Sequence, residues 1–220
     1  MPAALIPHRA GYALARPDGS DAGTETVEVA PGAGGWRIQT HIETWWPDEI
    51  TSTVDWDLDG KLVTRLLHIV SSERVTGETE LEVTVTGNGL LAHRRGPDGP
   101  TQVELGWGPS AELDYISAAF PMVMLARSGL APGASREVDA VQIGTLDLVP
   151  SIVGQVLRGL APGSGDGEES APVVSGAAVG QRVEFMVVET GVTSVAKATA
   201  EGVLVSYGRL LRLTWVETSK

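Results

Sequence analysis

The stretch from Asp55 to Leu66 reads DWDLDGKLVTRL and separates two very different folds. Its opening, D-x-D-x-D-G, matches the first half of the twelve-residue calcium loop of an EF-hand. That loop needs a bidentate glutamate at its twelfth position and an amphipathic helix on either side. The twelfth residue here is Leu66, and the flanks, residues 50–54 and 62–70, are rich in β-branched residues and lack helical spacing. The pattern therefore does not indicate an EF-hand.

The same stretch predicts a β-hairpin. Asp59-Gly60 is a strong two-residue turn signal. With these two residues at the tip, Leu58 lies opposite Lys61, and the aspartates occupy the solvent side of one strand. We therefore expect no metal site here. In this register the other face carries Val54, Trp56, Leu58, Val63, Leu67 and Ile69, together with Lys61 and Arg65.

Most of the chain alternates apolar and polar residues with a period of two, which is typical of β-strands. Turn-forming stretches rich in Gly, Pro, Asn and Asp separate the alternating segments. Short, evenly spaced strands predict an all-β fold with a single antiparallel meander sheet curled into a half-barrel or barrel, since an open sheet exposes its edges. The expected strands cover residues 24–30, 36–46, 50–58, 61–70, 78–86, 90–94, 101–105, 136–143, 181–190, 192–200, 203–207 and 209–216.

Two segments depart from this alternation, so we expect one or two short helical connections. Apolar residues are helically spaced between 111 and 128, and Pro121 is expected to split this segment into a short helix and a second turn. Residues 150–160 fit either a short helix that begins at Pro150 or a strand. The helically spaced residues are Leu113, Ile116, Phe120 and Met124.

The length of 220 residues suits a single domain, which we expect to span residues 1–220. Residues 1–20 are expected to form an N-terminal arm. Residues 161–171, APGSGDGEESA, are interpreted as a flexible acidic loop, because they contain nothing apolar to bury.

Composition argues against several classes of partner. The net charge is −12, and nucleic-acid phosphates require clustered Lys and Arg beyond the Arg94-Arg95 pair. Zero cysteines exclude disulfides and thiolate zinc sites. No stretch approaches the roughly 20 apolar residues of a membrane span, and the start of the chain lacks the apolar core of a secretory signal. We expect a soluble, cytoplasmic protein with no cofactor, no metal and no nucleic-acid partner; the oligomeric state is left open.

Catalytic motifs are absent from the sequence. None of the four histidines forms H-x-x-x-H, and there is no G-x-S-x-G elbow. A hydrolase that uses His41, Glu43 or His68 stays open; it requires an imidazole and a carboxylate about 3 Å apart beside a cavity. A structural or protein-interaction module without a small-molecule ligand is the other alternative.

Tryptophan is the commonest aromatic residue, with six copies against three Tyr and two Phe. Large apolar side chains normally fill a core. In barrels that hold a ligand, some of them line a cavity instead. Both interpretations stay open for Trp36, Trp45, Trp46, Trp56 and Trp215.

A series of landmarks follows one another over residues 24–216. They are Asp55-Trp-Asp57 followed by Arg65; Leu113-Asp114-Tyr-Ile-Ser-Ala-Ala-Phe-Pro121 with Arg127 and Leu130-Ala-Pro-Gly133; the strand pair 136–149 that ends at Pro150; and Ala200-Glu-Gly-Val-Leu-Val-Ser-Tyr207 with Arg209. Their order resembles that of the bacterial glycolipid-binding family, whose antiparallel β-proteins are similar in shape to the half-barrels of periplasmic lipoprotein carriers. Two departures are Gly208, where the family has Pro, and the absence of an Asn near Pro121.

The resemblance implies non-enzymatic binding or carriage of a lipid-like or glycolipid ligand on the concave face of the sheet. Such a site buries alkyl surface, at about 25 cal/mol per Å². A guanidinium offers a planar fork of donors that suits an anionic or sugar-phosphate head group. The candidate ligand-binding residues are Trp46, Trp56 and Trp215 for the wall, and Arg65, Arg127 and Arg209 for the head group.

Overall fold

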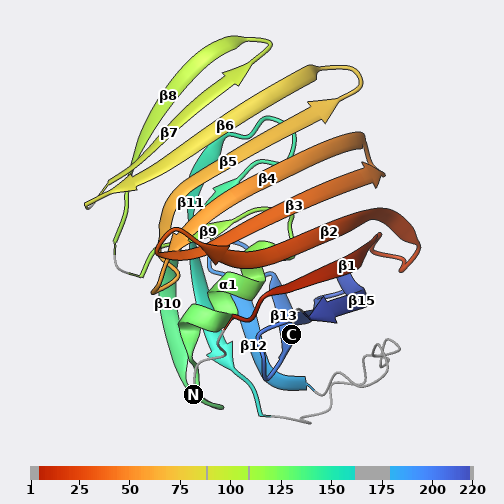
Figure 1. The fold of residues 1–220 in the computed structure, drawn as a ribbon, viewed down its shortest axis with the longest axis vertical. Helices are drawn as coiled ribbons and strands as arrows, with labels where there is room; N and C mark the ends of the chain where they lie inside the picture. Colours follow the sequence, from red (N-terminus) through yellow and green to blue (C-terminus); the bar gives the residue numbers. More distant parts are fainter. Residues whose placement is uncertain (1–4, 88, 109, 162–178, 219–220) are drawn as a thin grey trace.

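The computed structural model describes residues 5–87, 89–108, 110–161 and 179–218, whose strands join one continuous curled sheet (Figure 1). The strand order is β8-β7-β6-β5-β4-β3-β2-β1-β15-β14-β13-β12-β11-β10-β9. Neighbouring strands are antiparallel, except that β9 pairs with β10 in parallel. The sheet is not closed into a barrel, since β8 and β9 form its two ends. The predicted all-β fold with a single curled sheet is confirmed.

The elements follow the predicted strands closely, and every expected strand is present with its ends shifted by a few residues. The strands are β1 (His8–Ala15), β2 (Asp21–Gly32), β3 (Gly35–Trp45), β4 (Glu49–Asp59), β5 (Thr64–Glu73), β6 (Gly77–Thr86), β7 (Gly89–Gly96), β8 (Gly99–Gly106), β9 (Glu112–Asp114), β10 (Ser135–Ile143), β11 (Pro150–Gly159), β12 (Val179–Val187), β13 (Thr193–Thr199), β14 (Leu204–Tyr207) and β15 (Leu211–Thr218), and the helix is α1 (Ala119–Ser128).

Two segments needed the structure to place them, and a third lies almost wholly outside the described residues. Residues 8–15, expected in an N-terminal arm, form β1 between β2 and β15, because Ala10, Tyr12 and Leu14 alternate inward. Residues 150–159 form a strand rather than a helix. The expected acidic loop at 161–171 lies outside the described residues from position 162 onward.

The β4–β5 hairpin keeps most of its predicted inward residues, but Thr64 is buried and Arg65 exposed, and the predicted turn is wrong. Leu58 pairs with Thr64 and Trp56 with Leu67, so the two-residue turn is wrong and a longer loop connects the strands. A register shift between Asp57 and Leu58 lets the inward residues stay inward. The buried ones are Val54, Trp56, Leu58, Leu67 and Ile69.

The side chain of Asp59 explains the longer loop. Its Oδ1 accepts hydrogen bonds from the backbone N of Lys61, at 2.8 Å, and of Val63, at 2.9 Å. Leu62 between them takes a left-handed φ of 63°. The aspartate thus organises four residues of backbone and overrides the shorter turn that Asp59-Gly60 favours by itself.

Helix α1 is one helix that begins after Ala118, and the predicted split at Pro121 is wrong. Pro121 lies in the first turn, where a missing N–H costs no intrahelical bond. The helix ends at Gly129, whose φ of 54° is left-handed. Part of the helically spaced segment, residues 112–114, forms β9 instead.

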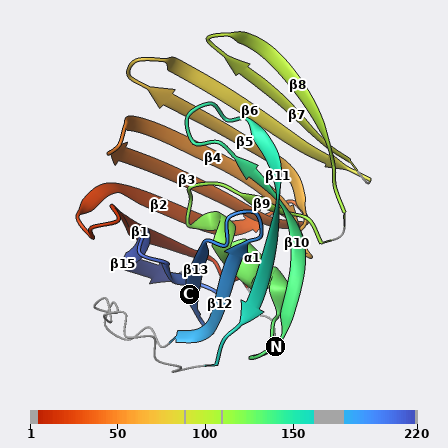
Figure 2. The ribbon, with the colours of Figure 1, turned by 180° about the vertical axis from the view of Figure 1, so that it is seen from behind.

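The helix fills the concave side of the sheet. Every residue from Ala119 to Ala126 is buried. Phe120 stacks on Trp56 with ring centroids 4.5 Å apart and an interplanar angle of 20°. Figures 1 and 2 show α1 inside the curl, between the strands β1 to β4 and the strands β10 to β13. The inner face of the sheet and the helix therefore share one apolar core.

Thr64→Val tests the polar contact within this core. Thr64 Oγ1 accepts a hydrogen bond of 3.0 Å from Trp56 Nε1, and both side chains are buried. Valine keeps the shape but leaves the indole N–H unpaired, so the free energy of unfolding should fall by about 1–3 kcal/mol in urea titrations. The control Thr53→Val, on the exposed face of β4, should change it by less than about 0.5 kcal/mol. Equal effects of the two substitutions would contradict this.

Candidate functional site

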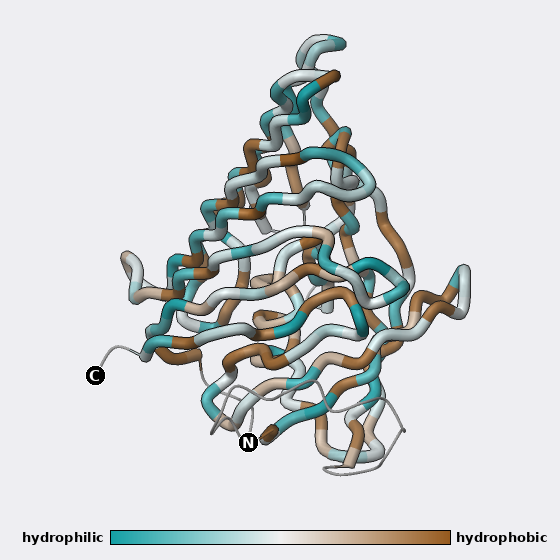
Figure 3. The backbone as a smooth tube through the Cα atoms, turned by 90° about the vertical axis from the view of Figure 1, so that its right-hand side faces the viewer, coloured by the Kyte–Doolittle hydropathy of each residue, from teal (hydrophilic) through white to brown (hydrophobic). Residues whose placement is uncertain are grey.

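The hairpin turns alternate between two ends of the sheet. The turn between β3 and β4 follows the Trp45–Glu49 pair, and the register places six other turns at the same end. These connect β1–β2, β5–β6, β7–β8, β10–β11, β12–β13 and β14–β15. We call this the β3–β4 end. It lies at the right for β1 to β6 in Figure 1, and Figure 3 views the molecule from that side.

Exposed apolar side chains gather at the β3–β4 end. Among the described residues, the exposed large apolar side chains outside it are Leu66 and Trp215. Singly scattered surface apolar residues are ordinary, so the shared location of these side chains makes this end of the sheet a candidate interaction surface. We call the residues at this end the apolar rim: Trp45, Trp46, Val75, Ile116, Leu146, Val149, Ile152, Val188, Val192 and Leu210.

Two neighbouring tryptophans belong to the apolar rim. Trp45 is 47% and Trp46 is 40% exposed. The guanidinium of Arg16, from the β1–β2 turn, lies 5.3 Å from the Trp46 ring centroid. This cation–π contact positions the indole while leaving part of its surface accessible.

Arg94 connects the two edges of the sheet at the β3–β4 end. Its Nη1 donates to Asp98 Oδ1 at 2.8 Å in the β7–β8 turn, and its Nε donates to the backbone O of Asp147 at 2.5 Å in the β10–β11 turn. The side chain is nearly buried. Because of these bonds, the turns of β7–β8 and β10–β11 lie side by side although β8 and β9 do not pair.

A polar row crosses the interior of the sheet close to the β3–β4 end. Its hydroxyl groups form a chain, in which Tyr115 Oη donates to Ser52 Oγ at 3.1 Å and Ser52 Oγ donates to Ser71 Oγ at 3.0 Å. Hydrogen bonding of this kind is what makes buried hydroxyls tolerable in an apolar core. The row consists of successive cross-strand partners and is polar except for Ile42; its members are Tyr12, Glu25, Ile42, Ser52, Ser71 and Thr79.

Glu25 in this row holds the beginning of α1. Its Oε1 accepts from Ser117 Oγ at 2.5 Å, and its Oε2 accepts from the backbone N of Ala118 at 2.8 Å. The N-cap residue Ala118 has no side chain that could do this, and the first turn has no acid of its own. Burial raises the pKa of Glu25 to about 7, against the opposing effect of these two hydrogen bonds.

Two further carboxyl groups lie just before the helix, on β9: Glu112 is buried and Asp114 is half-buried. Glu112 accepts from Arg127 Nη1 at 2.7 Å and from Arg136 Nη2 at 2.9 Å. Asp114 accepts from Gln155 Nε2 at 3.2 Å. Burial raises the pKa of Glu112 to about 7, even with both guanidiniums opposing it, and that of Asp114 to about 6.

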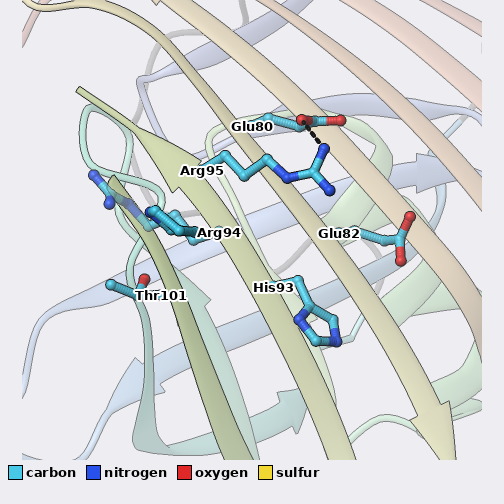
Figure 4. Close-up of a pocket in the computed structure, with 7 residues that line it drawn as sticks. Glu80, Glu82, His93, Arg94, Arg95 and Thr101 are labelled. Carbon is cyan, nitrogen blue, oxygen red and sulfur yellow. Dashed lines mark hydrogen bonds and ion pairs between the residues drawn. The ribbon is translucent and has the colours of Figure 1, made fainter. Parts of the chain in front are cut away.

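A hollow of about 380 Å³ lies over the strands β6 to β8 (Figure 4). Beside it, His68 Nε2 lies 2.8 Å from Glu80 Oε1, and Arg95 lies 3.4 Å from the other oxygen of that carboxylate. The hydrogen bond with His68 is the main cause that lowers the pKa of Glu80. The lining residues are Glu80, Glu82, His93, Arg94, Arg95, Pro100 and Thr101.

The hydrolase alternative therefore gains an imidazole–carboxylate pair beside a cavity. His41 and Glu43 also meet, at 3.2 Å, but neither lines this hollow. Thr101 supplies the lining's only hydroxyl, and in Figure 4 it lies away from His93. The described lining thus offers no serine or cysteine nucleophile to this pair.

The aspartates of the opening stretch contact protein groups. Asp55 Oδ1 accepts from Arg37 Nη2 at 2.7 Å and from Gln39 Nε2 at 3.0 Å. In the part of the chain that the structure describes, no three His, Asp or Glu side chains are grouped so that they could hold a metal ion.

The three tryptophans predicted to line the wall of a ligand site lie in three different places. Trp46 belongs to the apolar rim, and Trp56 lies in the core beneath Phe120. Trp215 lies on the convex face, where its indole covers Gly11 of the neighbouring strand. The structure therefore does not bring the three tryptophans together.

The three candidate arginines are also separated. Arg65 donates to the backbone O of Ala33 at 2.9 Å, at the end opposite to the apolar rim. Arg127 is paired with Glu112 in the interior. Arg209 lies in the β14–β15 turn, at the same end as Trp46. Of the six candidates, Trp46 and Arg209 share one end of the sheet.

The sequence reasoning missed most of the apolar rim, because most of its residues lie outside strands; Trp45 and Ile152 are the strand residues among them. The available signal was an apolar residue inside a turn-forming stretch. Val75 between Arg74 and Thr76 is the plainest case, and it is 85% exposed. Leu146 and Leu210 follow the same pattern.

Comparisons with known proteins support the fold. A β-barrel-like protein of a domain of unknown function, DUF1849, from Brucella abortus is similar in structure, with a TM-score of 0.58 and 14% identity over 99% of this chain and 100% of that one. A DUF1089 family protein from Pseudomonas aeruginosa has a TM-score of 0.49 and 17% identity, over 92% and 91% of the two chains. No family model and no curated protein matches the sequence. The likeness to the DUF1849 protein shows a β-barrel-like fold.

The length and apolar character of the helix bear on whether it could cross a membrane. Among the described residues, no helix has the length and the apolar character needed to span a bilayer.

Glu25→Gln should weaken the dependence of stability on pH. The pKa of Glu25 in the folded protein, about 7, exceeds its ordinary value of 4.5. Its contribution to stability is therefore fully present below pH 4.5 and is lost as the pH rises through 7. The loss is on the order of 3 kcal/mol. Urea titrations from pH 4.5 to 8 should show a shallower decline for this variant.

Glu28→Gln is the matched control, because Glu28 lies on the same strand but is exposed beside Arg9. It should keep the pH dependence of the wild type. A Glu25→Gln variant with the wild-type slope would contradict the assignment of the decline to Glu25.

Gly11→Ala should be destabilising because of Trp215. A Cβ at position 11 would lie 2.1 Å from Trp215 Nε1, so the indole would have to move. We expect a loss of about 1–3 kcal/mol in the free energy of unfolding. The same change made in a Trp215→Ala background should cost much less. Additive effects in this double-mutant cycle would contradict the packing role of Trp215.

Proposed function

We propose that this chain binds an apolar or amphiphilic, lipid-like ligand without catalysing a reaction, and that the ligand first meets the apolar rim. The observation that carries the proposal is the gathering of exposed apolar side chains at the β3–β4 end. Full burial of a large apolar side chain contributes roughly 1.5–3 kcal/mol. Trp45 and Trp46 are 47% and 40% exposed, so a ligand that covers each of them gains about half of that.

The polar surroundings of the apolar rim suit an amphiphile better than a wholly apolar molecule. Arg16 and Arg209 lie at the same end as the tryptophans. Asp48 and Glu49 lie there too, and the chain carries a net charge of −12. A head group that both donates and accepts hydrogen bonds, as a sugar does, fits this mixture better than a purely anionic one. This supports a glycolipid as one class of ligand.

The expected site on a free concave face needs revision. Helix α1 occupies that face, and Trp56 is covered by Phe120. The apolar rim is the accessible apolar surface at the edge of this occupied interior. Trp46 and Arg209 remain in the proposed site, while Arg127, paired with Glu112 inside the fold, is not available in this arrangement.

Removing the rim tryptophans should weaken ligand binding. The probe is 11-(dansylamino)undecanoic acid, a fatty acid whose fluorescence rises in apolar surroundings. Trp45→Ser with Trp46→Ser should raise its dissociation constant at least about tenfold, the equivalent of 1.4 kcal/mol. Leu66→Ser is the control, because Leu66 is similarly exposed but lies outside the apolar rim. Equal affinities of the two variants would place the binding elsewhere.

Native mass spectrometry of the freshly purified protein identifies the ligand class. A bound species of several hundred daltons that is lost on extraction with organic solvent supports the proposal. If no ligand is bound and neither the probe nor a panel of glycolipids and lysolipids binds, the lipid-binding function is wrong. A protein-interaction module would then account for the apolar rim.

A further inference from the structure

The two edges of the open sheet differ in how much backbone they offer to a partner strand. Strand β9, at one edge, has three residues, and a strand this short gives a partner little to pair with. Strand β8, at the other edge, has eight residues and pairs with β7 alone. It lies at the top of the molecule in Figures 1 and 2, at the outer border of the sheet. A long edge strand is where a further strand can add to a sheet.

The register of the β7–β8 hairpin determines which backbone groups of β8 face outward. Gly96 pairs with Gly99 across a two-residue turn, so these two residues exchange hydrogen bonds, and every second pair after them does the same. Val103 belongs to one of these pairs and bonds to β7. The N–H and C=O groups of its neighbours, Gln102 and Glu104, therefore face away from the sheet.

Strand β8 carries few of the features that usually protect an edge strand, which are lysines, β-bulges and prolines. It contains no lysine, and its pairing with β7 runs without a register shift. Pro100 removes one outward N–H near the turn, and Glu104 is the charged side chain of the strand. The outward backbone groups of Gln102, Glu104 and Gly106 remain available to a partner.

The apolar layer on the inner face of the sheet is incompletely covered at β8. On β7, Leu90 and Ala92 are buried. Their partners on β8, Leu105 and Val103, pack against the same core but are half-buried. A further strand beside β8 would cover both side chains, and the removal of this apolar surface from water stabilises the pairing.

We propose that β8 pairs in antiparallel orientation with β8 of a second copy of this chain, about a two-fold axis at Val103, so that two sheets join into one. Val103 then lies opposite Val103 of the second copy, and Gln102 lies opposite Glu104. The β3–β4 ends of the two copies point in opposite directions, because the paired strands are antiparallel. The dimer does not depend on the proposed lipid binding, and it is tested without a lipid.

The residues of β8 favour this axis over the neighbouring ones. Outward-facing residues must meet outward-facing residues, so the axis lies at a residue and not between two. An axis at Glu104 would place two carboxylates opposite each other, which is destabilising. An axis at Gln102 would set Pro100, which has no N–H, opposite Glu104 and lose hydrogen bonds there. With the axis at Val103, Pro100 faces Gly106 at the ends of the paired stretch, and the amide of Gln102 can donate to the carboxylate of Glu104.

Sedimentation velocity of the full chain, from about 1 to 200 μM, measures the association, because the dimer fraction of a reversible dimer rises with concentration. The wild type should form a dimer at the upper end of this range. Gln102→Pro removes an outward N–H but no bond to β7, so it should stay monomeric. Trp45→Ser with Trp46→Ser is the control and should dimerise like the wild type, because it changes the apolar rim alone. A monomeric wild type, a dimer that survives Gln102→Pro, or a dimer lost in the control overturns the β8 interface.

Two charge substitutions at Gln102 test the position of the axis. The side chain is exposed, so both variants should fold. Gln102→Lys places an ammonium group opposite Glu104 of the second copy, whereas Gln102→Glu places a carboxylate there. The two-fold axis makes each contact occur twice, so the dissociation constant of the dimer should fall about three- to tenfold with lysine and rise by a similar factor with glutamate. Equal constants for the two variants, or the reverse order, overturn the pairing about Val103.

Discussion

The contact of Glu25 with the beginning of α1 is the interaction on which the rest of the structure depends. An α-helix leaves its first amide groups without partners, and burying them unpaired is costly. Helix α1 has neither a capping side chain nor an acid in its first turn, so a carboxylate from β2 provides the contact. This allows a whole helix to lie inside the curl, where it gives an open, unclosed sheet its core.

With its interior filled, the sheet distributes its surface unevenly. The convex face is polar and carries ion pairs such as Arg37–Asp55 and Arg9–Glu28. The exposed apolar side chains gather instead at the turns of one end, and Arg94 holds the turns at the sheet's two edges together there. The accessible apolar surface therefore lies at the rim, while α1 and the buried carboxyls occupy the interior.

The differences between the predicted and observed folds have local causes. The β4–β5 turn lengthened because Asp59 makes two backbone contacts that a turn signal does not reveal. Strand β1 was missed because Gly11 and Ala13 make its outward face too small to show polar alternation. The helix was placed too early because Leu113 and Ile116 keep helical spacing by chance, although Leu113 lies in β9. In the first two cases a contact or small side chains outweighed the periodicity, and in the third the periodicity itself was misleading.

The sequence by itself determined the fold class and nearly every strand, because alternation along residues such as Val54, Trp56 and Leu58 is a local property that burial on one face imposes. It did not determine the candidate site. Glu25 and Ser117 meet across 92 positions of sequence, and the rim residues come from turns scattered along the chain. Only the tertiary structure decided which turns share an end and which carboxyl groups lose water, because these depend on how the sheet curls around α1.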